Sequence, residues 1–271
     1  MPTIFSDLSQ KRLRYASTHW SRDDDERKAL DQYLHLGDKV YNRTKFRLFS
    51  DLIGDVKGKR ILDYGGGAGI MAVPYAKAGA EVLLVDAEGN ALRTAEYYAK
   101  REGVTAHVHT LHSETFPASL KHERFDVVLA KDVVEHIDDD DRFLRDLGDC
   151  QLPGGRLILS TQNSHSLNYL IEGSYQRLWR GNKAWMGWDK THLRFYTPAS
   201  LRRKLKEAGY SVQHWAGALV VPYDILSWLS LLRKRVELPA LHYLDLTLGR
   251  HFPLNRFGWN IIVDAVRKPT T

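Results

Sequence analysis

A glycine-rich stretch at residues 61–69 offers the clearest chemistry in the sequence: it reads Ile-Leu-Asp-Tyr-Gly-Gly-Gly-Ala-Gly. An apolar, strand-like run ends in these glycines and leads into a helix-like run, so a ligand can approach bare backbone beside the N–H groups of a helix start. Residues 67–72 also fit the dinucleotide pattern G-x-G-x-x-A. An NAD-dependent dehydrogenase is therefore one interpretation of this loop.

Two carboxylates help to choose the ligand. Asp86 ends a second strand-like run, 82–86, and suits either interpretation, because its carboxylate can accept hydrogen bonds from both hydroxyls of an adenosine ribose. Asp63 lies inside the loop motif, where it would repel a dinucleotide pyrophosphate but attract a cofactor with a sulfonium and an ammonium group. Asp63 therefore favours a cationic cofactor over a dinucleotide.

The elements that must position these residues alternate along the chain. Strands are expected at 60–64, 82–86, about 106–110, 125–130 and 156–160, with helices at 70–78, about 89–102 and 140–147. This alternation predicts crossover connections and a parallel sheet with helices on both faces. Such open sheets bind ligands at the carboxyl ends of their strands, which is where both carboxylates fall.

Other segments surround this core. Residues 1–55 have helical periodicity and are expected to form an N-terminal helical cap on a main domain of residues 56–271. Residues 163–197 mix aromatic and basic side chains, which predicts a lid for substrate recognition or an aromatic satellite core. A helix at 198–208, N-capped by Thr197, precedes a second apolar and basic insertion at about 217–257. The last strands are expected at about 211–215 and 259–266.

Composition limits the class of protein. The chain of 271 residues has a single cysteine, Cys150, which excludes a disulfide framework and a cysteine-rich zinc module. No apolar run is long enough for a signal peptide or a membrane span, so a cytoplasmic protein is expected. Residues 156–271 carry a net charge of +10, against −4 for residues 1–155, which favours an anionic partner. The acidic run 138–141 is interpreted as a helix start, and no metal is expected.

Four ordered motifs resemble those of the class I S-adenosylmethionine-dependent methyltransferases: ILDYGGGAG, VLLVDAE, FDVVLAKDVVEHI and LPGGRLILST. The resemblance covers roughly residues 40–215. Within that superfamily, the stretches 134–137 and 191–198 are most similar to the ubiquinone-biosynthesis type of O-methyltransferase. The resemblance implies a Rossmann-like α/β fold with a seven-stranded, mostly parallel sheet and an antiparallel last strand. It also implies S-adenosyl-L-methionine as cofactor and a small-molecule acceptor, most readily methylated on a hydroxyl oxygen.

The resemblance also implies roles for individual residues. Asp63 would lie near the methionine amino group of the cofactor, Asp86 would hold its ribose, and Lys131 would present backbone to it. Arg47 matches, with a two-residue gap, an arginine that meets the cofactor carboxylate, and Arg43 is its rival. The remaining cofactor residues are Gly65, Gly66, Gly67 and Gly69 along the loop, with Ala87, Leu111, His112 and Ser113 beside the adenine. Relatives often carry an acidic residue at the last three positions, and this chain does not.

His136 and His192 are the candidate catalytic bases, because the resemblance places both over the cofactor methyl. An imidazole, with an unperturbed pKa of about 6.5, suits the removal of a proton from a hydroxyl. The structural alternatives are that His136 caps the next helix and that His192 makes a hydrogen bond within the lid. His165 and Asn163 are weaker candidates.

Alternative functions remain open at this point. The basic half and the aromatic, cationic segment would suit an RNA methyltransferase. However, AKDVVEHI replaces the Asn/Asp-Pro-Pro-aromatic turn of many base-amine methyltransferases, so a nucleic-acid partner is not expected. A non-catalytic cofactor-binding protein of the same fold is another alternative. Residues 218–250, with Trp228 and the basic run 233–235, suggest peripheral membrane contact and a lipophilic or lipid-linked acceptor.

Overall fold

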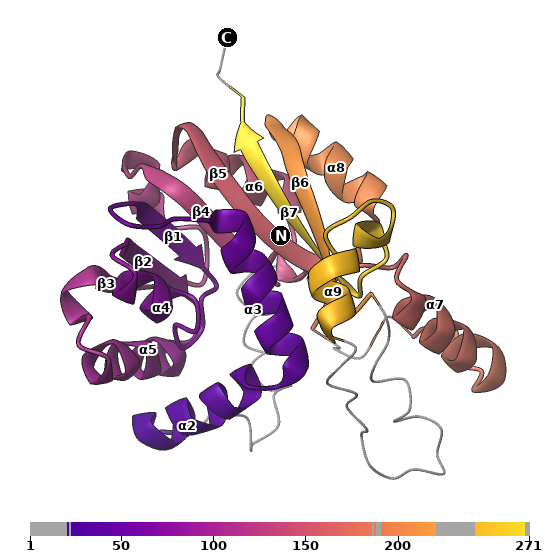
Figure 1. Cartoon of the computed structure of the whole chain (residues 1–271), viewed down its shortest axis with the longest axis horizontal. Helices are drawn as coiled ribbons and strands as arrows, with labels where there is room; N and C mark the ends of the chain where they lie inside the picture. Colours follow the sequence, from indigo (N-terminus) through magenta and orange to yellow (C-terminus); the bar gives the residue numbers. More distant parts are fainter. Residues whose placement is uncertain (1–20, 22, 186, 188–190, 221–241, 269–271) are drawn as a thin grey trace, which may run out of the picture.

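The computed structural model describes residues 21, 23–185, 187, 191–220 and 242–268. Within this part of the chain, one seven-stranded sheet has the order β3-β2-β1-β4-β5-β7-β6 (Figure 1). β7 is antiparallel to both of its neighbours, whereas the other adjacent strands are parallel. The strands are β1 (Arg60–Tyr64), β2 (Glu81–Asp86), β3 (Val108–His112), β4 (Phe125–Lys131), β5 (Gln151–Gln162), β6 (Tyr210–Ala218) and β7 (Asn260–Arg267).

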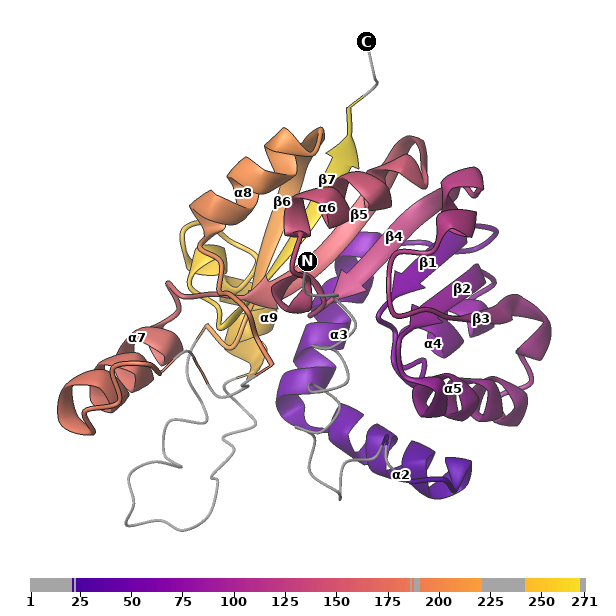
Figure 2. The same cartoon turned by 180° about the vertical axis from the view of Figure 1, so that it is seen from behind.

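Helices cover both faces of the sheet, as Figures 1 and 2 show from opposite sides. Successive strand side chains point to opposite faces, so Ile61 packs with α3, α4 and α5 while Leu62 packs with α6 and α8. The helices are α2 (Glu26–Gly37), α3 (Val40–Ile53), α4 (Ala72–Lys77), α5 (Gly89–Arg101), α6 (Asp140–Asp149), α7 (Leu167–Ser174), α8 (Pro198–Glu207) and α9 (His242–Leu248). Two hydrophobic cores, one on each face, therefore hold the sheet.

The structure confirms the predicted fold class: a mostly parallel, seven-stranded sheet with an antiparallel last strand. Two predicted boundaries are wrong. β3 lies two residues later than expected, so Leu111 and His112 belong to the strand itself rather than to the loop after it. β5 begins at Gln151 rather than at residue 156. Residues 152–155 belong to the strand, at a point where the register of its pairing with β4 shifts.

The N-terminal helices are attached to the sheet at defined points. The guanidinium of Arg156 on β5 donates hydrogen bonds to the carbonyl oxygens of Leu52 and Ile53, at the end of α3, and pairs with Asp264 on β7. From there α3 crosses the face of the sheet, and its first turns reach the carboxyl end of β4. α2 then lies beside α5 (Figure 1). The described part of the predicted cap therefore reaches the carboxyl ends of the strands, where open α/β sheets bind ligands.

The segment 191–197 is tied back to the sheet at the same edge. Tyr196 pairs with Asn163 in a parallel bridge, and its hydroxyl donates a hydrogen bond to Asp140 at 2.6 Å. Thr197 caps α8 in a capping box with Ser200, as the sequence predicts. The N-terminal residues 1–20 and most of the second insertion, 221–241, lie outside the described residues. Among the helices described, none combines the length and the apolar character needed to cross a membrane.

Candidate active site

The glycine loop joins β1 to α4, and its backbone requires glycine. Gly65, Gly67 and Gly69 have φ values of +71°, +58° and +81°, a region that other residues rarely adopt. At Gly66 the limit is space, because a Cβ atom would lie 2.7 Å from the Asp63 carboxylate oxygen Oδ2. The four predicted glycines thus form one tight turn, which lies directly against Asp63.

Asp63 is a buried carboxylate whose hydrogen-bonding capacity is only partly used: it accepts a hydrogen bond from the backbone N–H of Ala72. Its side chain is 1% exposed, and Oδ2 accepts no hydrogen bond from the described residues. Burial raises the pKa of Asp63 to about 7, with a smaller contribution from the negative charge of Asp86; the Lys131 ammonium, at the end of β4, opposes the rise. A buried carboxylate oxygen without a partner is costly, so this site suits a ligand with a positively charged hydrogen-bond donor.

Asp86 links the loop to the end of β2. Its carboxylate accepts hydrogen bonds from the N–H groups of Gly67 at 2.8 Å and Glu88 at 2.9 Å. The backbone N–H of Ala87 also contributes a hydrogen bond. Because a carboxylate has about four acceptor positions, capacity remains for a ribose hydroxyl. The structure thus brings Asp63, Asp86 and the glycines together at adjacent strand ends.

The residues predicted beside the adenine are only partly grouped. His112 Nε2 lies 3.0 Å from the carbonyl oxygen of Ala87, and the Ser113 N–H donates a hydrogen bond to the carbonyl oxygen of Asp86. Leu111 points to the other face of β3, where it packs against the core beside α6. The side chains of Leu111 and His112 therefore do not share one surface.

The structure does not bring Arg47 to the glycine loop. Its side chain is 68% exposed and pairs with Asp51 one turn further along α3. Arg43, its rival, is also exposed. Lys45 occupies the inward side instead, because a step of two residues turns a helix by about 200°.

Lys45 and Asp132 form an ion pair that the sequence analysis missed, in which the lysine is buried and the Asp132 side chain is 27% exposed. The Lys45 side chain is 3% exposed and contacts the carboxylate of Asp132, which follows β4 in a left-handed conformation with φ +57°. Asp132 Oδ1 also accepts hydrogen bonds from Ser160 at 2.9 Å and Asn260 at 3.1 Å. Although burial opposes ionisation, the ammonium groups of Lys45 and Lys131 hold the pKa of Asp132 below its usual range. The signal available in the sequence was a lysine on the apolar side of a helix.

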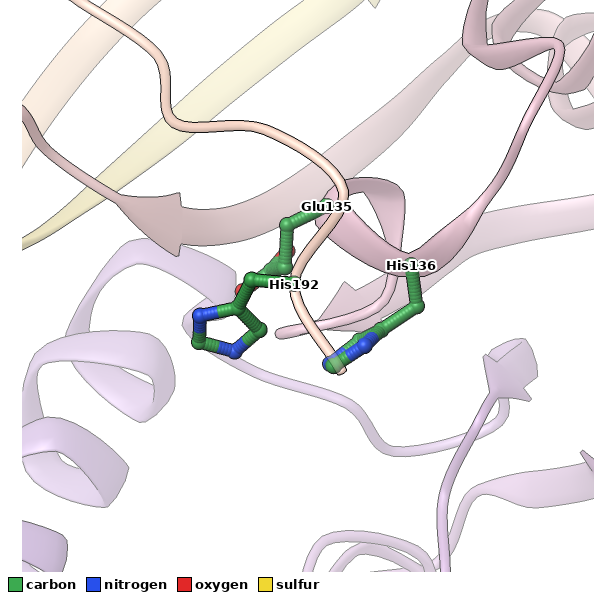
Figure 3. Close-up of side chains that lie close together, drawn as sticks. All are labelled: Glu135, His136 and His192. Carbon is green, nitrogen blue, oxygen red and sulfur yellow. The ribbon is translucent and has the colours of Figure 1, made fainter. Parts of the chain in front are cut away.

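Four residues after Asp132, the chain presents the predicted histidine His136. His136 and His192 lie with their ring centres 4.8 Å apart, and His136 Nδ1 is 3.2 Å from both the carbonyl and the hydroxyl oxygen of Thr191 (Figure 3). His136 does not cap α6, because Asp139 accepts the hydrogen bond from the helix N–H of Arg142. The structure therefore brings both candidate bases together, although they come from positions 56 residues apart.

Glu135 is a third member of this cluster, and the sequence analysis missed it. Its side chain is fully buried, one carboxylate oxygen accepts a hydrogen bond from Thr161 at 2.9 Å, and the other has no partner among the described residues. Burial, reinforced by Asp132, raises the pKa of Glu135 to about 8. Glu135 is therefore largely protonated at neutral pH, and one of its carboxylate oxygens lies within 4.8 Å of a ring nitrogen of each histidine.

The same three residues form a donor set that could hold a metal ion, although no metal was expected. One ligand atom from each of Glu135, His136 and His192 lies within 4.8 Å of the others. Two ligands of one zinc ion, each about 2.1 Å from it, can be at most about 4.2 Å apart. At 4.8 Å, the cluster would have to contract to close on an ion.

The weaker candidates have structural contacts. Asn163 is fully buried, and its side-chain amide donates hydrogen bonds to the carbonyl oxygens of Arg256 at 2.8 Å and Gly258 at 2.9 Å. The N–H of His165 donates to the side-chain oxygen of Asn163 at 2.9 Å. In the acidic run 138–141, Asp139 is the N-cap of α6 and Asp140 is its first residue, which confirms the interpretation as a helix start. Asp140 also pairs with Arg194 and Lys204.

Replacing Lys45 tests whether the ion pair holds α3 against the sheet. Lys45→Met leaves the Asp132 carboxylate without its cation, so we expect the free energy of unfolding to fall by about 3 kcal/mol. The matched control, Arg47→Met, removes an exposed charge on the same helix and should change it by less than about 0.5 kcal/mol. Urea unfolding measures both. Equal, small losses for the two variants would show that the pair contributes little.

The chain also matches known proteins. A family model described as a methyltransferase domain matches residues 33–214. A ubiquinone biosynthesis O-methyltransferase of Azorhizobium caulinodans is 35% identical over 172 residues, which cover 62% of this chain and 64% of that protein. A second, from Aeromonas salmonicida, is 32% identical over 183 residues, which cover 67% and 75%. The chain therefore spans just under two thirds of the length of the Azorhizobium relative.

Solved structures agree on the fold. An S-adenosylmethionine-dependent methyltransferase from Mesorhizobium loti aligns with a TM-score of 0.56 at 17% identity, over 83% of this chain and 98% of that one. The cyclase SpnF aligns with a TM-score of 0.58, also at 17% identity, over 87% and 85%. Identities this low show a shared fold only. The family model, by contrast, covers about two thirds of the sequence, and on that ground the chain belongs to the methyltransferase domain family.

Proposed function

We propose that this methyltransferase transfers the methyl group of S-adenosylmethionine to a hydroxyl oxygen of a small-molecule acceptor. The observation that carries the proposal is the pair of imidazoles, His136 and His192, grouped beside the end of β4. Transfer to a hydroxyl requires removal of a proton, which an imidazole can accept near neutral pH. The two relatives named as O-methyltransferases support the same target atom.

The residues present fit the cofactor. S-adenosylmethionine carries an ammonium group and an adenosine ribose. The loop offers a buried carboxylate, Asp63, with one oxygen that has no partner among the described residues, and a second carboxylate, Asp86, at the next strand end. When bound, the cofactor supplies an electrophilic methyl group on a positively charged sulfur. An NAD-dependent dehydrogenase is not favoured, because Asp63 would meet its pyrophosphate with a negative charge.

The chain's own residues then have three tasks. The glycine loop holds the cofactor against bare backbone, so that its reactive end is fixed. Thr191 orients His136 through the hydrogen bond at Nδ1. The imidazole pair accepts the hydroxyl proton as the oxygen attacks. Glu135, close to both rings and largely protonated, adds little negative charge there at neutral pH.

The acceptor is proposed to be lipophilic and to be met at a membrane surface. The predicted contact at 218–250 lies largely outside the described residues, but α7 and the turn after it expose apolar side chains. Leu178 is 78% exposed and Trp179 is 84% exposed, with the exposed cations Arg180 and Lys183 close by in sequence. Apolar and basic side chains together suit an anionic lipid surface. Figure 2 shows α7 projecting away from the sheet.

Histidine variants test the chemistry. His136→Ala and His192→Ala should each bind S-adenosylhomocysteine like the unmodified chain, and at least one should lose about 100-fold or more in kcat, since a general base contributes about that much. His122→Ala, an exposed histidine outside the site, is the matched control. Turnover is measured with hydroxylated aromatic acceptors. Near-normal turnover in both variants would exclude a histidine base.

Turnover measured with a chelator distinguishes a histidine base from a metal site at the same cluster. With imidazole bases, EDTA leaves turnover unchanged. Loss of turnover in EDTA, restored by Mg²⁺ or Zn²⁺, would contradict the proposed base and assign Glu135, His136 and His192 as metal ligands.

Membrane contact is tested by co-sedimentation. We expect the chain to sediment with phosphatidylglycerol vesicles at low salt and the double variant Leu178→Glu/Trp179→Glu to remain in the supernatant, because it loses the exposed apolar contacts. Phe252→Glu is the matched control, since this side chain is 79% exposed at another part of the surface. A chain that never sediments at low salt would contradict membrane contact.

A further inference from the structure

The N-terminal helix α2 lies directly on the glycine loop. At its last residue, Gly37, a Cβ atom would lie 2.5 Å from the Ile70 side chain, so the helix end and the loop are in close contact. Near the start of the helix, the side-chain amide of Asn90 on α5 donates a hydrogen bond to the carbonyl oxygen of Ser21 at 3.1 Å. The end of α2 therefore packs against the glycine loop, and the chain just before α2 is bonded to α5.

Tyr33 lies one helical turn before Gly37 and therefore on the same side of α2. Its hydroxyl oxygen accepts hydrogen bonds from the backbone N–H groups of Ala68 and Ile70, within the glycine loop. A side chain of the predicted N-terminal cap thus reaches the loop that is proposed to hold the cofactor.

Two carboxylates influence the pKa of the Tyr33 hydroxyl. Burial raises the pKa of its hydroxyl, and the carboxylates of Asp63 and Asp86 both add to the rise. These are the two groups proposed to meet the methionine amino group and the ribose. The Tyr33 hydroxyl therefore stays protonated at neutral pH and can act as a hydrogen-bond donor.

A carboxylate group of a ligand in this place needs hydrogen-bond donors that add no negative charge. The methionine part of S-adenosylmethionine carries a carboxylate, and Asp63 and Asp86 would repel it. The arginine that the sequence predicts for this task, Arg47, is 68% exposed and pairs with Asp51. A protonated tyrosine hydroxyl donates a hydrogen bond without adding negative charge, and its oxygen is already oriented by two N–H groups.

We propose that Tyr33 is a cofactor-binding residue whose hydroxyl donates a hydrogen bond to the methionine carboxylate of S-adenosylmethionine. This inference rests on the proposed function, because it requires that cofactor in the glycine loop. It makes α2 part of the cofactor site rather than only a cover on the sheet.

Two ligands and two variants test the inference by calorimetric titration. S-adenosylhomocysteine has the amino-acid carboxylate, whereas 5′-methylthioadenosine lacks the whole amino-acid part but keeps adenosine. We expect Tyr33→Phe to bind the first about tenfold more weakly, as expected for a lost hydrogen bond to a charged group, and the second within about twofold. Tyr98→Phe, a half-buried tyrosine on α5, should leave both affinities unchanged.

The outcomes separate the contact from a structural role. Unchanged binding of S-adenosylhomocysteine by Tyr33→Phe would overturn the inference while leaving the proposed function intact. Equal weakening for both ligands would also overturn it, because it would show that the hydroxyl only holds the loop in shape. No binding of S-adenosylhomocysteine by the unmodified chain would overturn both this inference and the proposed function.

Discussion

The buried carboxylate of Asp63 is the constraint on which the rest of the cofactor site depends. The carboxylate is almost fully buried, one oxygen has no partner among the described residues, and its pKa of about 7 shows the cost of that position. The surrounding structure accommodates the carboxylate: Gly66 has no side chain at a position where a Cβ atom would lie 2.7 Å from Oδ2, and Lys131 offsets part of the cost. A ligand with an ammonium group relieves that cost, which is why this loop suits a sulfonium amino acid better than a dinucleotide.

A second set of charges lies beside the two histidines proposed to act on the acceptor. Lys45 reaches from α3 to Asp132, and the turn that follows Asp132 carries Glu135 and His136. The N-terminal helices therefore contact both halves of the site, with Lys45 at the end of β4 and Tyr33 at the glycine loop. The fold alone does not identify this chemistry, because the cyclase SpnF has a similar fold. The side chains that this chain places at the strand ends support methyl transfer.

The sequence predicts the parts of the site that depend on local pattern. Asp63 and Asp86 follow short apolar runs, so their positions at strand ends can be predicted from periodicity. The side chains that cross between elements could not be predicted in this way. Glu135 was passed over because its burial depends on the packing of Thr161 and the segment 191–197. Arg47 and Arg43 are the candidates that the sequence offers, and Lys45 is missed, because a resemblance with a two-residue gap does not fix which side of a helix faces the sheet.

The most direct test of this account is the calorimetric titration of the chain with S-adenosylhomocysteine, with NAD as control, between pH 6 and pH 8. Asp63 has a pKa of about 7 without ligand, and its ionised form binds the ammonium group. The account therefore predicts affinity about tenfold higher at pH 8 than at pH 6, loss of this dependence in Asp63→Asn, and no binding of NAD. Binding of NAD without binding of S-adenosylhomocysteine would contradict it.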